Sequence, residues 1–314
     1  MIQTLQSLRF IFVMMIFMSH FSYHEIQPFD AGGDCGVAFF FVLSGFVVSL
    51  GYGRQVREGT FSYGSFLLRR LKKFYPLHLL CLLFIFVVRH SALEWKTILN
   101  ALLLQSWIPV PDYYFSYNGV SWFLSSILFC YLVFPWAYKH VTRAWLTAIL
   151  GAYIVVVIMT PYDKVNAILY VNPLIRFVDF YLGMVLCRIY ERGTFCQTGR
   201  WELLLIAAVI MTLAIYPLCD AKLRNAPLYW IVIIPLILTF AHSQGFVSQL
   251  LQTKPMLFLG SLTMPLFMTH QILLGILPRK LPEMPTILMV AVCVLIALVV
   301  SWCIQIIFSR LFRL

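Results

Sequence analysis

The stretch LRFIFVMMIFMSH at residues 8–20 decides the class of fold, because it is apolar enough to enter a lipid bilayer and yet contains Arg9 and His20. These two residues are eleven positions apart, which is three helical turns plus about 20°, so both lie on one stripe of a helix. They are about 16 Å apart along the helix axis, too far for a salt bridge between them. Ionisable groups in a membrane helix are costly unless they face protein or water, so both residues are candidates for a functional site.

The composition of the whole chain indicates a membrane protein. Of its 314 residues, 61% are hydrophobic and only 11% are charged, and the mean hydropathy is +0.88. One water-soluble core cannot bury that much apolar surface. An outer-membrane barrel is excluded, because its strands alternate polar and apolar residues, whereas this chain has continuous apolar runs. The composition therefore predicts an all-α polytopic membrane protein.

The apolar runs predict about ten transmembrane helices in a single membrane-embedded domain, residues 1–314. With both termini in the cytoplasm, 15 of the 23 Lys and Arg residues fall on the cytoplasmic side, as the positive-inside rule requires. The net charge of +11 therefore reflects orientation among membrane lipids, and we expect no nucleic-acid partner. The predicted spans are residues 8–23, 36–52, 74–90, 119–138, 144–160, 172–190, 202–218, 227–242, 256–278 and 286–308.

The cysteines and the basic cluster invite two further interpretations. None of the eight cysteines forms a CxxC pair and most lie in apolar runs, so we expect them to pack in the core and predict no metal site. The basic cluster LLRRLKKFYP at residues 67–76 is predicted to lie in a cytoplasmic loop, where Tyr75-Pro76 ends one turn and starts the next helix. It is either an interfacial stop signal that meets anionic lipids or a dock for the phosphates of a soluble cofactor. Its cations are Arg69, Arg70, Lys72 and Lys73.

His20 and Ser44 each have a functional and a structural interpretation. His20 lies near the far end of the first predicted helix; it is either a hydrogen-bonded structural residue or a general base toward a hydroxyl. Ser44 lies next to Gly45, and this small pair favours helix packing. A covalent role for Ser44 has less support, because no G-x-S-x-G turn surrounds it.

In combination these features resemble the membrane acyltransferase-3 family of bacterial O-acyltransferases. The resemblance rests on Arg9 and His20 in the first helix together with the order and spacing of five strings over nearly the whole chain. They are GVAFFFVLSGF (36–46), RRLKKFYP (69–76), NGVSWFLSSILFCYLVFP (118–135), RFVDFYLGMVL (176–186) and LGSLTMPLFMTHQILL (259–274).

The resemblance implies an enzyme in the bacterial inner membrane that moves an acyl group, usually acetyl, from cytoplasmic acyl-CoA to a hydroxyl of a surface or exported glycan or glycolipid. It implies that His20 is the essential catalytic histidine and Arg9 its partner. It also implies that Arg70 and Lys73 occupy an R-x-x-R motif, in which lysine replaces the second arginine. Lysine keeps the charge of that arginine but lacks its planar fork.

The same chemistry assigns roles to the remaining candidates. An acyl transfer needs a base, an oriented thioester and a stabilised oxyanion. We expect Arg9 and the basic cluster to hold the CoA phosphates, while acceptor binding or oxyanion donation is assigned to Asn118, Ser121 and Trp122, with packing as the alternative for Trp122. Arg176 and Asp179 are one turn apart, which favours an intrahelical ion pair over a contact of Asp179 with His20. His270 is a secondary candidate.

Two rival functions remain open at this stage. A transporter or flippase would use Arg9 and His20 to line a substrate or proton path. A noncatalytic membrane scaffold would leave the basic cluster to lipid binding. Only the acyltransferase hypothesis predicts release of CoA thiol from acetyl-CoA.

Overall fold

The computed structural model describes residues 2–23, 32–90, 92–193, 199, 201–242 and 245–312, and within them the chain is helical and contains no strand. Each of the ten predicted spans falls on one helix or, for 256–278, on a pair of helices. These helices are α1 (Gln3–Ser19), α2 (Gly32–Glu58), α3 (Tyr63–Val88), α6 (Trp122–Lys139), α7 (Arg143–Met159), α8 (Pro173–Glu191), α9 (Trp201–Ile215), α11 (Pro227–His242), the pair α13 (Lys254–Ser261) and α14 (Thr263–Lys280), and α15 (Thr286–Phe312).

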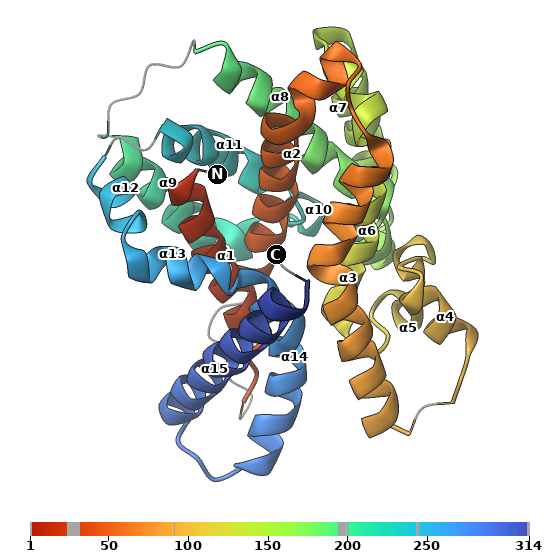
Figure 1. Ribbon diagram of the computed structural model, residues 1–314, viewed down its shortest axis with the longest axis vertical. Helices are drawn as coiled ribbons and strands as arrows, with labels where there is room; N and C mark the ends of the chain where they lie inside the picture. Colours follow the sequence, from red (N-terminus) through yellow and green to blue (C-terminus); the bar gives the residue numbers. More distant parts are fainter. Residues whose placement is uncertain are drawn as a thin grey trace.

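Shorter helices connect these elements. The α-helical ones are α4 (Trp95–Ala101), α5 (Pro111–Tyr114), α10 (Ala221–Arg224) and α12 (Phe246–Leu251). Single turns of 3₁₀ or π helix are η1 (Gln105–Trp107), η2 (Gly119–Ser121), η3 (Tyr162–Lys164), η4 (Asn166–Tyr170) and η5 (Tyr216–Leu218). Figure 1 shows α4 and α5 at one edge of the molecule, beside α3.

Six helices of the described chain are long and apolar enough to cross a membrane, or seven if α13 and α14 form one broken span. The bend between α13 and α14 is 58°. α1 and α7 are apolar but shorter, and α8 carries both charges of the ion pair Arg176–Asp179. The chain is therefore a multi-pass helical protein, while the count of ten crossings and the cytoplasmic termini stay predictions.

Helix α2 is the centre of the bundle, with α1, α6, α8 and α11 packed around it (Figure 1). Its closest neighbour is α8, because both helices present glycine at the crossing. A Cβ on Gly45 would meet the carbonyl oxygen of Phe180, and a Cβ on Gly183 would meet that of Val42. The prediction that Gly45 serves helix packing is confirmed, and the contact fixes α2 against α8 backbone to backbone.

We expect Gly45→Ala to destabilise the protein by about 1–3 kcal/mol, because the added methyl group must push two backbones apart. Gly51→Ala on the same helix is the matched control, since a Cβ there meets nothing within 4 Å, and alanine favours the helix over glycine by about 1 kcal/mol. Thermal unfolding in detergent, followed by tryptophan fluorescence, measures both. Equal melting temperatures for the two variants would contradict the close crossing.

Three of the predicted cytoplasmic helix ends lie at one end of the bundle. The Arg57 guanidinium near the end of α2 donates to the Tyr138 hydroxyl near the end of α6 at 2.7 Å and to the Glu191 carboxylate at the end of α8 at 3.1 Å. The Arg188 guanidinium lies over the Tyr138 ring, 4.6 Å from its centroid. This arrangement agrees with the alternation of loops on which the predicted topology rests.

The basic cluster of residues 67–76 does not lie in a loop, so that prediction is wrong. Helix α3 begins at Tyr63 and continues unbroken through Pro76 to Val88. In membrane helices the groups that proline leaves unpaired can be satisfied by neighbours, so proline need not end the helix. The four cations therefore lie on a regular helix, where only residues three or four positions apart share a face.

Candidate functional site

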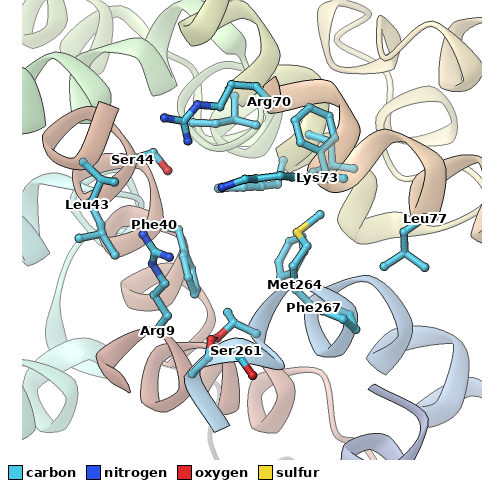
Figure 2. Close-up of a pocket in the computed structure, with 18 of the residues that line it drawn as sticks. Arg9, Phe40, Leu43, Ser44, Arg70, Lys73, Leu77, Ser261, Met264 and Phe267 are labelled. Carbon is cyan, nitrogen blue, oxygen red and sulfur yellow. The ribbon is translucent and has the colours of Figure 1, made fainter. Parts of the chain in front are cut away.

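A cavity of about 510 Å³ opens between α1, α2, α3, α6, α15 and the break between α13 and α14. Its walls are mostly apolar, and no acidic side chain of the described chain lines it. Three cations line it, each from a region that the sequence analysis had singled out: Arg9 on α1, and Arg70 and Lys73 on α3. Figure 2 shows these three side chains around one common space, with Ser44 of α2 beside them.

The three cations make this cavity electropositive. None of them forms an ion pair with a described residue, and they lie close enough to repel one another. Arg9 and Arg70 are half-buried and Lys73 is exposed, so an anion that enters the cavity can pair with all three charges. The arrangement therefore fits a ligand with several negative charges.

Arg70 is held in place by aromatic rings and not by an acid. The carbon at the centre of its guanidinium lies 5.4 Å from the ring centroid of Tyr52 and 5.5 Å from those of Phe66 and Tyr131. Cation–π contacts of this kind fix the group and leave its N–H donors available for a planar acceptor. The Nε atom of Arg70 is buried and has no hydrogen-bond partner within the described residues. Buried donors are normally paired, so this N–H is a position at which a bound anion would accept.

The other half of the basic cluster lies outside the cavity. Arg69 and Lys72 are exposed, as Lys73 is, but they are not among the residues that line the cavity. On the continuous helix the four cations spread over an arc of about 160°, with Arg70 and Lys73 on the side that faces the cavity and Arg69 and Lys72 on the other. The structure thus brings two of the four predicted phosphate ligands together with Arg9.

His20 ends α1 and pairs with His270 of α14. The His20 Nδ1 atom lies 3.2 Å from His270 Nε2, and the two ring centroids are 5.1 Å apart. His20 is exposed and His270 is fully buried. The position of His20 at the far end of its helix is confirmed, and its partner is a residue that the sequence analysis treated as secondary.

Neither histidine lines the cavity, but one residue connects the two places. Phe267 belongs to the cavity wall, and its ring centroid lies 6.0 Å from that of His270, one helical turn further along α14. Arg9 and His20 are likewise both on α1. The electropositive cavity and the histidine pair are therefore two ends of one region between α1 and α14.

Asn118, Ser121 and Trp122 are buried beside this region and not in the cavity. The Asn118 amide donates to the Met268 carbonyl of α14 at 2.9 Å, two residues before His270. The Ser121 hydroxyl accepts from the amide of Gln105 at 3.2 Å. The Trp122 ring packs against Tyr170 with centroids 4.8 Å apart. These contacts support α14 and its surroundings.

Arg176 and Asp179 form the predicted ion pair within α8, at 2.8 Å and fully buried. The remaining donors of Arg176 go to backbone carbonyls. The second carboxylate oxygen of Asp179 accepts from the indole N–H of Trp230 at 2.5 Å. Both groups are thus committed to the scaffold, and His20 contacts His270.

Two groups of site residues had no clear signal in the sequence. The rings around Arg70 come from three helices, and only Phe66, four positions before Arg70, could have been inferred from helical spacing. The polar rim of the cavity is formed by Ser261, at the end of α13, and Gln305 of α15, whose side chains are hydrogen-bonded at 2.9 Å. Such contacts between distant segments depend on the tertiary fold.

Comparison with known proteins gives the chain its relatives. A family model described as an acyltransferase domain matches residues 2–306. Acyltransferase MdmB of Streptomyces mycarofaciens is 32% identical over 216 residues, which is 59% of this chain and 54% of the relative. Protein 2 in picA locus of Rhizobium radiobacter is 48% identical over 52 residues, 17% of this chain and 27% of the relative. The chain thus spans about half, or less, of the curated relatives it matches. No solved structure matches it.

Proposed function

The chain belongs to the acyltransferase-3 family, and from this premise we propose that it transfers an acetyl or similar acyl group from cytoplasmic acyl-CoA to a hydroxyl of a surface or exported glycan or glycolipid. The family match spans nearly the whole chain and favours a transferase over the transporter and scaffold hypotheses. The donor, the acceptor and the base are our proposals, and the geometry of the site supports those of the donor and the base.

The observation that carries the proposal is the cavity with three unpaired cations. Arg9, Arg70 and Lys73 converge on it without an acidic partner in the described chain, and the buried Nε of Arg70 lacks an acceptor there. The nucleotide end of CoA carries several phosphate charges, which charge-assisted hydrogen bonds from arginine and lysine hold well. We therefore assign the CoA phosphates to these three residues and no longer to Arg69 and Lys72.

The apolar part of the cavity suits the rest of the donor. Phe40 and Leu43 of α2, Phe123 of α6 and Met264 of α14 wall it, and apolar walls suit the arm of an acyl-CoA, with polar groups needed only where orientation is fixed. Phe267 stands between this wall and His270. The thioester would therefore have to pass the Phe267 ring to reach the histidine pair.

In the proposed reaction, His20 acts as general base. The acceptor hydroxyl gives its proton to the imidazole of His20, and its oxygen attacks the thioester carbonyl carbon. The tetrahedral intermediate then collapses, the carbon–sulfur bond breaks, and the leaving CoA thiolate takes the proton back from the imidazolium of His20, which restores the neutral base. No covalent acyl-enzyme is needed, so Ser44, which lines the cavity, is given no nucleophilic role.

We place the protein in the bacterial inner membrane, as a multi-pass protein whose partners are membrane lipids and a glycan or lipid-linked saccharide. Several apolar helices support the membrane location. The acceptor and acyl group would be identified by comparing the ester content of cell-surface polysaccharides in cells with and without this protein.

The donor site is tested by replacing one cavity arginine and its exposed neighbour. We expect Arg70→Gln to weaken acetyl-CoA binding by about 10- to 100-fold, because a hydrogen bond to a charged group contributes about 1.5–3 kcal/mol. The matched control is Arg69→Gln, an equal loss of charge one residue away and outside the cavity, which is expected to change the affinity less than about threefold. Binding of labelled acetyl-CoA to the protein in lipid nanodiscs measures both dissociation constants. Equal weakening by the two variants would point to a nonspecific basic surface.

A further inference from the structure

The hydrogen bonds around the histidine pair define which ring nitrogens carry protons. His270 Nδ1 lies 2.7 Å from the Phe267 carbonyl oxygen, and a carbonyl can only accept, so Nδ1 is the donor. In the neutral ring of His270, the other nitrogen, Nε2, is then an acceptor. This Nε2 is the atom that faces His20.

The contacts of His20 fix its proton in the same way. Its Nδ1 lies 2.9 Å from the Ile16 carbonyl oxygen and 3.2 Å from His270 Nε2, and both of these atoms are acceptors. A proton on Nδ1 of His20 satisfies both contacts at once. The lone pair of the neutral His20 ring is then on Nε2, on the opposite side of the ring from His270.

We propose that His270 is a positioning residue: the Ile16 carbonyl already keeps the proton of His20 on Nδ1, and the buried Nε2 of His270 adds a second acceptor that orients the His20 ring and stabilises its cation. This inference rests on the proposed acyl transfer and adds a second histidine to it. When His20 takes the proton of the acceptor hydroxyl at Nε2, the ring becomes a cation with N–H groups on both sides. His270 Nε2 then accepts from the Nδ1–H of that cation, and no proton needs to pass to His270.

The surroundings of His270 suit this role. Its side chain is fully buried, and its ring lies 6.1 Å from that of Phe17 on α1 and 6.0 Å from that of Phe267. Asn118 holds the preceding turn of α14 through the Met268 carbonyl. A ring fixed in this way presents its acceptor nitrogen to His20 at a constant position, and burial keeps it neutral.

The pair is also distinct from the other histidines that end helices. His140 ends α6 and lies 2.8 Å through Nδ1 from the Trp136 carbonyl, the same bond to the fourth preceding residue that His20 makes. The His140 ring packs against Trp136 and Trp145 and not against a second histidine. His20 differs from His140 in having a second acceptor for its Nδ1–H, the Nε2 atom of His270.

Two variants separate positioning from packing. His270→Leu removes the acceptor, and we expect a turnover number about 10- to 100-fold lower with an unchanged Michaelis constant for acetyl-CoA, since a lost positioning bond acts on the transition state and not on donor binding. His270→Gln places an amide oxygen near the position of Nε2 and is expected to recover a large part of the loss. His78→Leu is the control, because His78 is also a buried histidine, which is bonded to the Asn100 carbonyl and has its ring beside that of Tyr75 on the same helix.

A spectroscopic measurement tests the contact without relying on activity. The ¹⁵N shifts of protein with labelled histidine, with His20 assigned from a His20→Gln variant, should show a protonated Nδ1 in the wild-type protein, in His78→Leu and in His270→Leu, because the Ile16 carbonyl accepts from it in all three. In His270→Leu the Nδ1 shift of His20 should nevertheless move, because one of its two acceptors is lost. An unchanged Nδ1 shift in His270→Leu, or equal turnover for the Leu and Gln variants, overturns the inference.

These outcomes are distinct from failure of the proposed function. If the wild-type protein releases no CoA thiol with any hydroxyl acceptor, the acyl transfer itself is wrong, whatever the tautomer of His20. If transfer occurs and His270→Leu retains wild-type turnover, only the role of His270 is wrong.

Discussion

The His20→Gln variant is expected to bind acetyl-CoA as the wild-type protein does and to transfer its acyl group about 10²- to 10⁴-fold more slowly, which is the usual contribution of a general base. Binding should survive because the donor contacts are assigned to Arg9, Arg70 and Lys73, and His20 does not line that cavity. Release of CoA thiol from membranes that contain the protein, acetyl-CoA and the acceptor measures the rate. The dissociation constant for acetyl-CoA is measured separately in nanodiscs.

The matched control for this experiment is His140→Gln. His140 also follows the last residue of its helix and makes the same ring-to-carbonyl bond to the fourth preceding residue. We expect its loss to change neither binding nor rate by more than about twofold, as is usual for a surface substitution. Normal thiol release by the His20→Gln variant would exclude His20 as the base. A comparable loss in both variants would show that the helix ends, and not the base, limit the rate.

The positions of the helices were accessible from the sequence because lipid-exposed and buried helices both require continuous apolar runs. The first predicted span, residues 8–23, nevertheless began too late. Helix α1 starts at Gln3 because polar residues in its first turns are buried by tertiary contacts: the hydroxyl of Thr4 donates to the Phe240 carbonyl, and that of Ser7 to the Leu251 carbonyl. A hydropathy pattern counts such residues as solvent-facing.

Individual residues of the candidate site were predictable from the sequence, but their arrangement in space was not. Arg9 was identified from its charge in an apolar context, and Arg70 and Lys73 as two of the four cations of the basic cluster. Even a helix predicted as continuous through Pro76 puts the four cations on one arc of about 160°, so which of them face the cavity depends on the tertiary fold. The pairing of His20 with His270 joins residues 250 positions apart. A periodic pattern in the sequence does not reveal a contact between residues so far apart along the chain.

The second large effect concerns the scaffold. We expect Asp179→Asn to reduce the free energy of unfolding by about 3–5 kcal/mol, because it leaves the guanidinium of Arg176 as an uncompensated charge at a position with 0% exposure. Arg176 cannot move to water, since its other donors are bonded to the carbonyls of Tyr170, Leu169 and Asn225. Unfolding in mixed micelles with increasing dodecyl sulfate, followed by tryptophan fluorescence, measures the loss.

The chain provides a matched pair that isolates burial as the cause. Arg54 and Glu58 also form an ion pair within one helix, at 2.7 Å, but their side chains are 82% and 51% exposed. Water screens such a pair, so Glu58→Gln should cost less than about 1 kcal/mol. If the two neutralising substitutions destabilise the protein equally, then charge burial is not what fixes α8. If only Asp179→Asn does so, the ion pair in α8 anchors the helix against which α2 packs through Gly45, and so supports α2, which carries Ser44 and Phe40 into the donor cavity.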